Sequence, residues 1–158
     1  MELEFDVRID AGVLYDYMLR HTYSSGVGIL GSAVGALGVV AFFLRGYPLY
    51  LILGLLILLY QPAALYLRAK RQALNPVFKQ PLHYRMDQEG VFVSQGETEQ
   101  FQRWADMYKA VSTGRSLILY TSKVNACIFP RKDLGEKQAD VIAAISRHMA
   151  PEKVQIRM

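Results

Sequence analysis

The amino-acid sequence predicts an α+β membrane protein, in which a two-helix transmembrane hairpin is joined to a small β-rich domain. Two apolar runs predict the hairpin: residues 26–44 and 47–67 contain no charged side chain and are separated only by Arg45 and Gly46. Short strand-like segments separated by turn residues, which begin after residue 80, predict the domain. The chain therefore divides into residues 1–25, the hairpin 26–67 and a domain 68–158.

The first 25 residues are patterned as a strand and a short helix. Charged residues alternate with the apolar residues Leu3, Phe5, Val7 and Ile9. This period of two predicts a half-buried strand. Asp10 is a good N-cap for a following amphipathic helix. The apolar face of that helix consists of Val13, Leu14, Tyr17 and Met18. We expect the helix to lie along the lipid headgroups.

Each apolar run is long enough to cross a bilayer as a helix. At ~1.5 Å per residue, the first run spans about 28 Å and the second about 31 Å, close to the hydrocarbon thickness. Helices satisfy their own backbone groups, as a lipid environment requires. A cleavable signal peptide is the alternative for the first run, but 25 patterned, net acidic residues precede it.

Basic residues near the ends of the runs predict the orientation of the hairpin. Arg68, Lys70 and Arg71 follow the second run and Arg20 precedes the first, whereas Arg45 alone lies in the connecting turn. The positive-inside rule places both termini in the cytosol. The three residues after the second run are either topology anchors alone or also a surface for anionic lipid headgroups. Candidate interfacial anchors are Tyr47, Tyr50, Tyr60 and Tyr66.

Small residues in the first run predict a close helix contact. The candidate packing residues are Gly28, Gly31, Gly35 and Gly38. Glycines one turn apart let two helix backbones approach closely. The partner is either the second helix of the same hairpin or a helix of another chain, which would give a homo-oligomer or a larger complex.

The charge distribution bears on the kind of binding partner, and the cysteine count limits disulfides and metal sites. Residues 1–25 carry a net charge of −3 and residues 68–158 carry +6. A modestly basic domain beside a bilayer suits anionic lipid better than nucleic acid, although solubility alone also explains it. Cys127 is the single cysteine, so the chain forms no internal disulfide and no paired-cysteine metal site.

The carboxy-terminal part reads as six strands and a closing helix. The predicted strands are 82–87, 91–95, 99–103, 107–112, 117–121 and 125–129. Past Pro130 the period changes to that of an amphipathic helix, whose apolar face consists of Leu134, Val141, Ile142, Ile145 and Met149. The amino-terminal strand is a candidate seventh.

The two spans are followed by the segments PLHYRMDQEGVFVSQGE, RWADMYKAV, LILYTS and NACIFPRKDL. In this arrangement the sequence resembles the YcxB-like family. The most telling pieces are the strand-turn-strand around Asp87–Gly90, the step from Trp104 to Asp106, and Ile128–Arg131 before the closing helix. The resemblance implies a PH-like β-roll of about seven strands closed by a carboxy-terminal helix. It implies no established activity.

No catalytic, cofactor or metal site is predicted. Cys127 lies in an apolar strand, as buried thiols do. The three histidines are far apart and lack a second ligand at metal-binding spacing. The carboxylate pairs Asp87/Glu89 and Glu97/Glu99 lie at turns, where solvated acids are common. A phosphate-binding loop and a serine-histidine motif are also missing from the sequence.

Trp104 and Arg103 are the candidate recognition residues, with Trp104 either a core anchor or an exposed ring. The predicted function is a non-enzymatic, membrane-anchored interaction module, which presents its domain at the inner membrane surface to a protein or lipid partner. The alternative is a small accessory subunit of a membrane transporter or signalling complex, docking through its glycine-rich first span.

Overall fold

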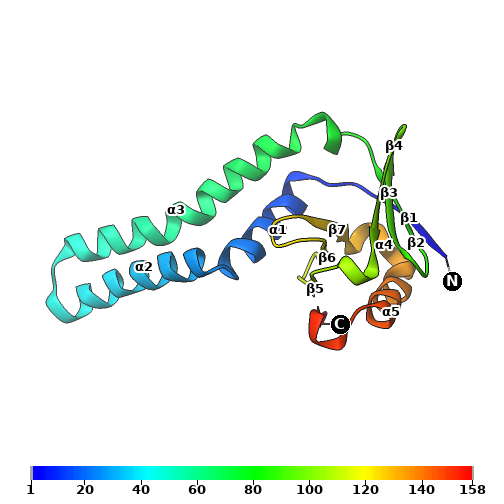
Figure 1. The fold of residues 1–158 in the computed structure, drawn as a ribbon. Coiled ribbons are helices and arrows are strands. Elements are labelled where there is room, and N and C mark those ends of the chain that lie inside the picture. The colour runs from blue at the N-terminus through cyan, green and yellow to red at the C-terminus, as the bar shows by residue number, and fades with distance from the viewer. Residues whose placement is uncertain (1, 158) are drawn as a thin grey trace.

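The computed structural model describes residues 2–157 and shows an α+β fold with two β-sheets and two long apolar helices (Figure 1). The long helices form a hairpin that projects from one side of the domain. Its connecting turn lies far from both termini.

The first sheet contains strands from both sides of the hairpin in the sequence. It consists of β1 (Leu3–Val7), β2 (Leu82–Met86), β3 (Gly90–Gln95) and β4 (Thr98–Arg103), antiparallel and in that order. β1 precedes the hairpin and β2 follows it, and Phe5 lies opposite Tyr84. The amino-terminal strand is therefore part of the domain, as the strand count predicts.

The second sheet has the order β7-β6-β5-β8. β5 (Lys109–Ser112), β6 (Ser116–Tyr120) and β7 (Ala126–Pro130) are antiparallel neighbours. All seven predicted strands are present, and the six after the hairpin have ends within two residues of those predicted. β8 (Val154–Gln155), parallel to β5, was not predicted because two residues are too few to show a period.

The core lies between the sheets and beneath the carboxy-terminal helix. Phe5 stacks on Tyr84, and both rings meet Phe129 of β7 edge-on. Val141 and Ile145 of α5 (Gln138–His148) are buried in the same cluster. The predicted closing helix is divided: α4 (Arg131–Leu134) comes first, and Gly135 then takes a positive φ of 51° before a 3-10 turn at Gly135–Lys137.

The short helix α1 (Ala11–Tyr23) begins as predicted, with Asp10 Oδ1 accepting a hydrogen bond from Val13 N at 2.8 Å. Val13 and Leu14 are buried in the core, and Tyr17 and Met18 pack against it. The domain itself therefore covers the apolar face of α1.

The hairpin consists of α2 (Gly26–Arg45) and α3 (Pro48–Ala73). α2 ends at Gly46, whose positive φ of 68° makes the tight turn. α3 extends six residues past Leu67, where the sequence prediction ends the span. Charged side chains end an apolar run without ending a helix, and the helix stops only at Leu74, before Asn75 and Pro76.

Candidate membrane and recognition surfaces

The two long helices expose most of their apolar surface. Both are long and apolar enough to cross a membrane, and only 11% of the residues in each apolar window are buried. Leu37 is 66% exposed and Phe43 is 78% exposed. A core helix of a water-soluble protein would be mostly buried. This surface therefore needs a cover that the chain does not supply over the residues described.

Glycines allow α2 and α3 to pack closely against each other. A Cβ atom added to Gly38 would lie 2.9 Å from Gly54 Cα, and one added to Gly54 would lie 2.8 Å from Gly35 O. At Gly35 an added Cβ would meet Leu58 Cγ at 2.7 Å. These three glycines thus let the two backbones touch. Of the predicted packing residues, Gly35 and Gly38 contact the other helix of the same hairpin.

The other two predicted glycines lie differently. An added Cβ at Gly28 would collide with Thr22 O of α1, and one at Gly31 would reach only Gln61 Oε1, at 3.5 Å. Gly28 therefore allows the start of α2 to lie close to the end of α1, and Gly31 makes an ordinary van der Waals contact. Sequence analysis missed Gly54, since a lone glycine among leucines gives no spacing signal.

The base of the hairpin is built into the domain. Leu65 and Ala69 of α3 are buried, and Ala69 belongs to the same core cluster as Val13 and Leu14 of α1. Tyr15 and Tyr66 pack edge-on with ring centroids 5.5 Å apart. The last turns of α3 are thus packed into the domain.

Basic side chains surround this base. Arg68, Lys70 and Arg71 are exposed on α3, and Arg20 is exposed near the end of α1. Lys70 Nζ lies 4.9 Å from the centroid of the Tyr66 ring. The predicted basic residues are therefore free to meet a charged surface at the domain end of the hairpin.

The candidate anchors lie at the hairpin turn, near the middle of α3 and at the base of the hairpin. Tyr47 and Tyr50 pack edge-on at the hairpin turn, while Tyr66 lies at the base. Tyr66 lies 19 positions after Tyr47, which is about 28 Å along the helix. Tyr60 is 75% exposed and lies about 9 Å along the helix from Tyr66.

Trp104 is a core residue. Its side chain is 5% exposed, and its Nε1–H donates to Asp87 O at 2.9 Å. The ring stacks on His148 with centroids 5.2 Å apart. It therefore ties the β2–β3 turn to the end of α5. Arg103 instead is exposed, and its Nε donates to Asp106 Oδ2 at 2.9 Å.

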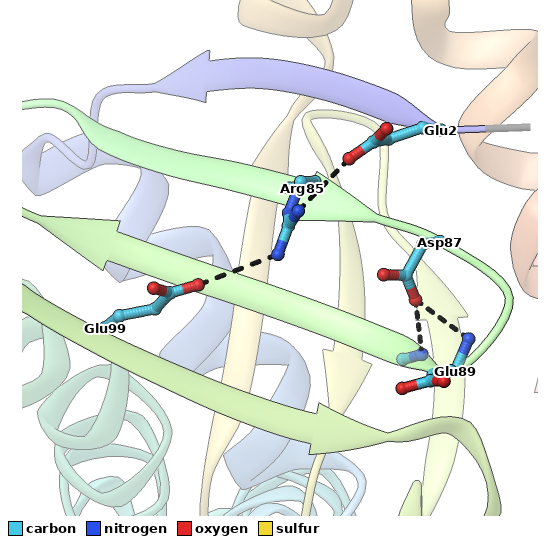
Figure 2. A network of polar contacts seen from close by, with 6 residues as sticks. Glu2, Arg85, Asp87, Glu89 and Glu99 are labelled. Carbon is cyan, nitrogen blue, oxygen red and sulfur yellow. Dashed lines mark hydrogen bonds and ion pairs between the residues drawn. The ribbon is translucent and has the colours of Figure 1, made fainter.

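The carboxylates of the first sheet have structural partners, as Figure 2 shows. Asp87 Oδ1 accepts hydrogen bonds from Glu89 N at 2.8 Å and from Gly90 N at 3.0 Å, which closes the β2–β3 turn. Arg85 lies between Glu2, at 3.2 Å, and Glu99, at 3.9 Å. Asp87 and Glu99 are thus occupied in the turn and in an exposed ion-pair network.

A groove of about 610 Å³ lies between the inner face of β2–β4 and the β6–β7 turn. Its walls carry uncharged side chains, among them Tyr84, Gln100, Gln102, Asn125 and Cys127. Burial raises the pKa of the Cys127 thiol to about 11, although a hydrogen bond from Tyr84 opposes the rise. The thiol is therefore protonated at neutral pH.

The three histidines lie in three separate places. His83 Nδ1 is 2.7 Å from Asp6 Oδ1, His148 stacks on Trp104, and His21 packs against Tyr120. Between residues 2 and 157, no three His, Cys, Asp or Glu side chains gather in a way that would hold a metal ion.

Comparison with known proteins gives one finding. Residues 87–145 match the family model described as YcxB-like protein. The matched segment runs from the Asp87 turn through both sheets to Ile145 of α5. Neither the curated proteins nor the solved structures gave a match. The segment carries the turn at Asp87, the Trp104 step and the Ile128–Arg131 stretch, so residues 87–145 are similar to the YcxB-like family, the resemblance that the sequence predicts.

Proposed function

We propose that this protein is a membrane-anchored, non-enzymatic interaction module. In this proposal α2 and α3 cross the cell membrane, both termini are cytosolic, and the domain lies against the inner leaflet. The observation that carries the proposal is that the hairpin exposes most of its apolar surface while the last turns of α3 are packed in the domain core. A bilayer is the cover that suits such a surface.

The fold of the domain supports a PH-like roll. Seven strands in two antiparallel meanders are followed by α5, which is the element order that the family resemblance implies. The basic residues at the base of the hairpin would then face anionic headgroups, each adding about 1 kcal/mol of attraction near the surface. Tethering keeps the domain at high effective concentration towards a protein or lipid partner at the same surface.

The non-enzymatic part of the proposal draws on the roles of the candidate groups. Asp87 holds a turn, Glu99 pairs with Arg85, and the Cys127 thiol is protonated at neutral pH. The accessory-subunit alternative comes second, because Gly35 and Gly38 already contact α3 of the same chain.

Alkaline carbonate extraction of membranes tests the anchor. We expect the full chain to stay in the membrane pellet. The variant Leu37→Lys/Leu56→Lys places two charges on exposed apolar positions, each costing about 2.5–3.5 kcal/mol at a helix centre, and it should be partly released. The control Glu97→Lys/Lys123→Glu changes two domain charges and should stay in the pellet. Release of the unaltered chain into the soluble fraction would overturn the proposal.

A further inference from the structure

The first sheet has an open edge at β4. All six residues of β4 are exposed, and β3 is its only neighbouring strand in the part of the chain that the structure describes. The opposite edge, at β1, is engaged by side chains: Lys137 Nζ donates to Glu4 O at 2.6 Å, and Arg8 N donates to Asp133 Oδ2 at 2.8 Å. An exposed strand edge is a template for another strand.

The register shows which backbone groups face outward. Trp104 N donates to Glu89 O at 3.2 Å, and Gln95 and Thr98 close the two-residue β3–β4 turn. Bonding alternates along an antiparallel pair, so the bonds to β3 come from Thr98, Gln100 and Gln102. The N–H and C=O groups that point to the open edge are therefore those of Glu99, Phe101 and Arg103.

The same three residues form one face of the strand. Phe101 stacks on Phe92 with ring centroids 4.4 Å apart, and the Arg85 guanidinium lies 4.1 Å from the Phe92 ring centroid. Glu99 and Arg103 flank Phe101 at two residues on either side. Within one copy Glu99 pairs with Arg85 and Arg103 pairs with Asp106, and both pairs are exposed and therefore weak. The edge thus carries opposite charges placed symmetrically about an aromatic ring.

We propose that β4 pairs with β4 of a second copy of this chain, antiparallel and centred on Phe101. Phe101 then lies opposite its own equivalent, and each Glu99 lies opposite Arg103 of the other copy. The outward backbone groups of all three residues meet their equivalents as hydrogen-bonded pairs, and the strand is therefore self-complementary in backbone, apolar contact and charge. On the other face, Gln100 lies opposite Gln102 of the second copy.

The symmetry suits two chains in one membrane, a step that rests on the proposed function. An antiparallel pair of this kind has its two-fold axis perpendicular to the sheet. In Figure 1 the sheet of β1–β4 is seen nearly edge-on and stands across the direction in which α2 and α3 extend. The axis therefore runs roughly along the hairpins, and both hairpins point the same way.

Charge reversal tests the pairing in full-length protein in mild detergent, with the mass measured by sedimentation. Glu99→Arg or Arg103→Glu alone sets like charges opposite each other twice, and we expect dimer affinity to fall about tenfold or more. The double variant Glu99→Arg/Arg103→Glu keeps both local changes, restores complementarity between copies, and should regain the dimer. A mixture of the two single variants should form only the mixed dimer.

A disulfide provides a second readout. In a Cys127→Ala background, Phe101→Cys should cross-link to its equivalent on oxidation, since directly opposed residues lie about 5.5 Å apart at Cα. Thr98→Cys is the matched control on the same strand, where the equivalents lie about 20 Å apart at ~3.4 Å per residue. A monomeric wild type, a double variant no better than the single ones, or equal cross-linking at both positions would overturn the pairing. None of these results depends on whether the hairpin spans a membrane.

Discussion

At the scale of single residues, several polar side chains join one element of the domain to another. Asp10 caps α1 and also accepts a hydrogen bond from Lys132 Nζ at 2.6 Å, which joins α1 to α4. The Lys132 ammonium holds the pKa of Asp10 below its usual value. This pair is exposed, so its contribution to stability is small.

Cys127 offers a direct chemical test at this scale. With its pKa raised to about 11, the thiolate is about a thousandth of the population at pH 8. Alkylation by iodoacetamide should therefore be slow and should accelerate about tenfold per pH unit between pH 7 and pH 10. The comparison is an exposed thiol in a Thr98→Cys/Cys127→Ala variant, whose rate should level off above about pH 8.5. A rate for Cys127 that levels off at the same pH would contradict the assignment.

Trp104 tests the distinction between a core anchor and a recognition ring. Trp104→Ala should lower the free energy of unfolding by about 3–5 kcal/mol, because it leaves a cavity and removes the hydrogen bond to Asp87 O. Tyr108→Ala, which removes a nearby ring that is 44% exposed, should cost much less. Thermal unfolding of the full chain in detergent measures both. Equal effects would argue against the anchor role of Trp104.

At the scale of elements, the hairpin depends on glycine contacts that only the structure reveals. The spacing in α2 predicts a close-packing face, but the partner position Gly54 is found only once α3 is placed beside α2. In the same way, Arg68, Lys70 and Arg71 mark the end of the apolar run, while α3 continues because its next turns pack on α1.

Substitution of single glycines tests this contact. Gly54→Ala places a methyl group 2.8 Å from Gly35 O and from Val39 N, so α2 and α3 must separate, at a cost of about 1–3 kcal/mol. Gly31→Ala meets only Gln61 Oε1, at 3.5 Å, and should be neutral or slightly stabilising. Resistance of the hairpin to unfolding in a detergent titration compares the two. If Gly31→Ala were the more damaging change, the helix contact would lie elsewhere.

At the scale of the whole molecule, the sequence predicts much of the fold because its periods are strong. Alternation identifies β1, short strand-like segments between turn residues identify β2 to β7, and uncharged length identifies α2 and α3. The sequence could not predict the features that form where segments far apart in the chain pack together. The groove between the sheets, the stacking of His148 on Trp104 and the burial of α1 all depend on tertiary packing. The open edge of β4 likewise appears only when the strand order is known.

The most direct test of the membrane hairpin is thiol labelling of the full chain in intact cells with a membrane-impermeant maleimide. In a Cys127→Ala background, Tyr47→Cys lies at the hairpin turn and Glu97→Cys lies at the β3–β4 turn. We expect the Tyr47→Cys thiol to react from outside, and the Glu97→Cys thiol to react only after the cells are permeabilised. Labelling of the Glu97→Cys thiol in intact cells would contradict the orientation. Protection of both thiols until lysis would contradict a hairpin that crosses the membrane.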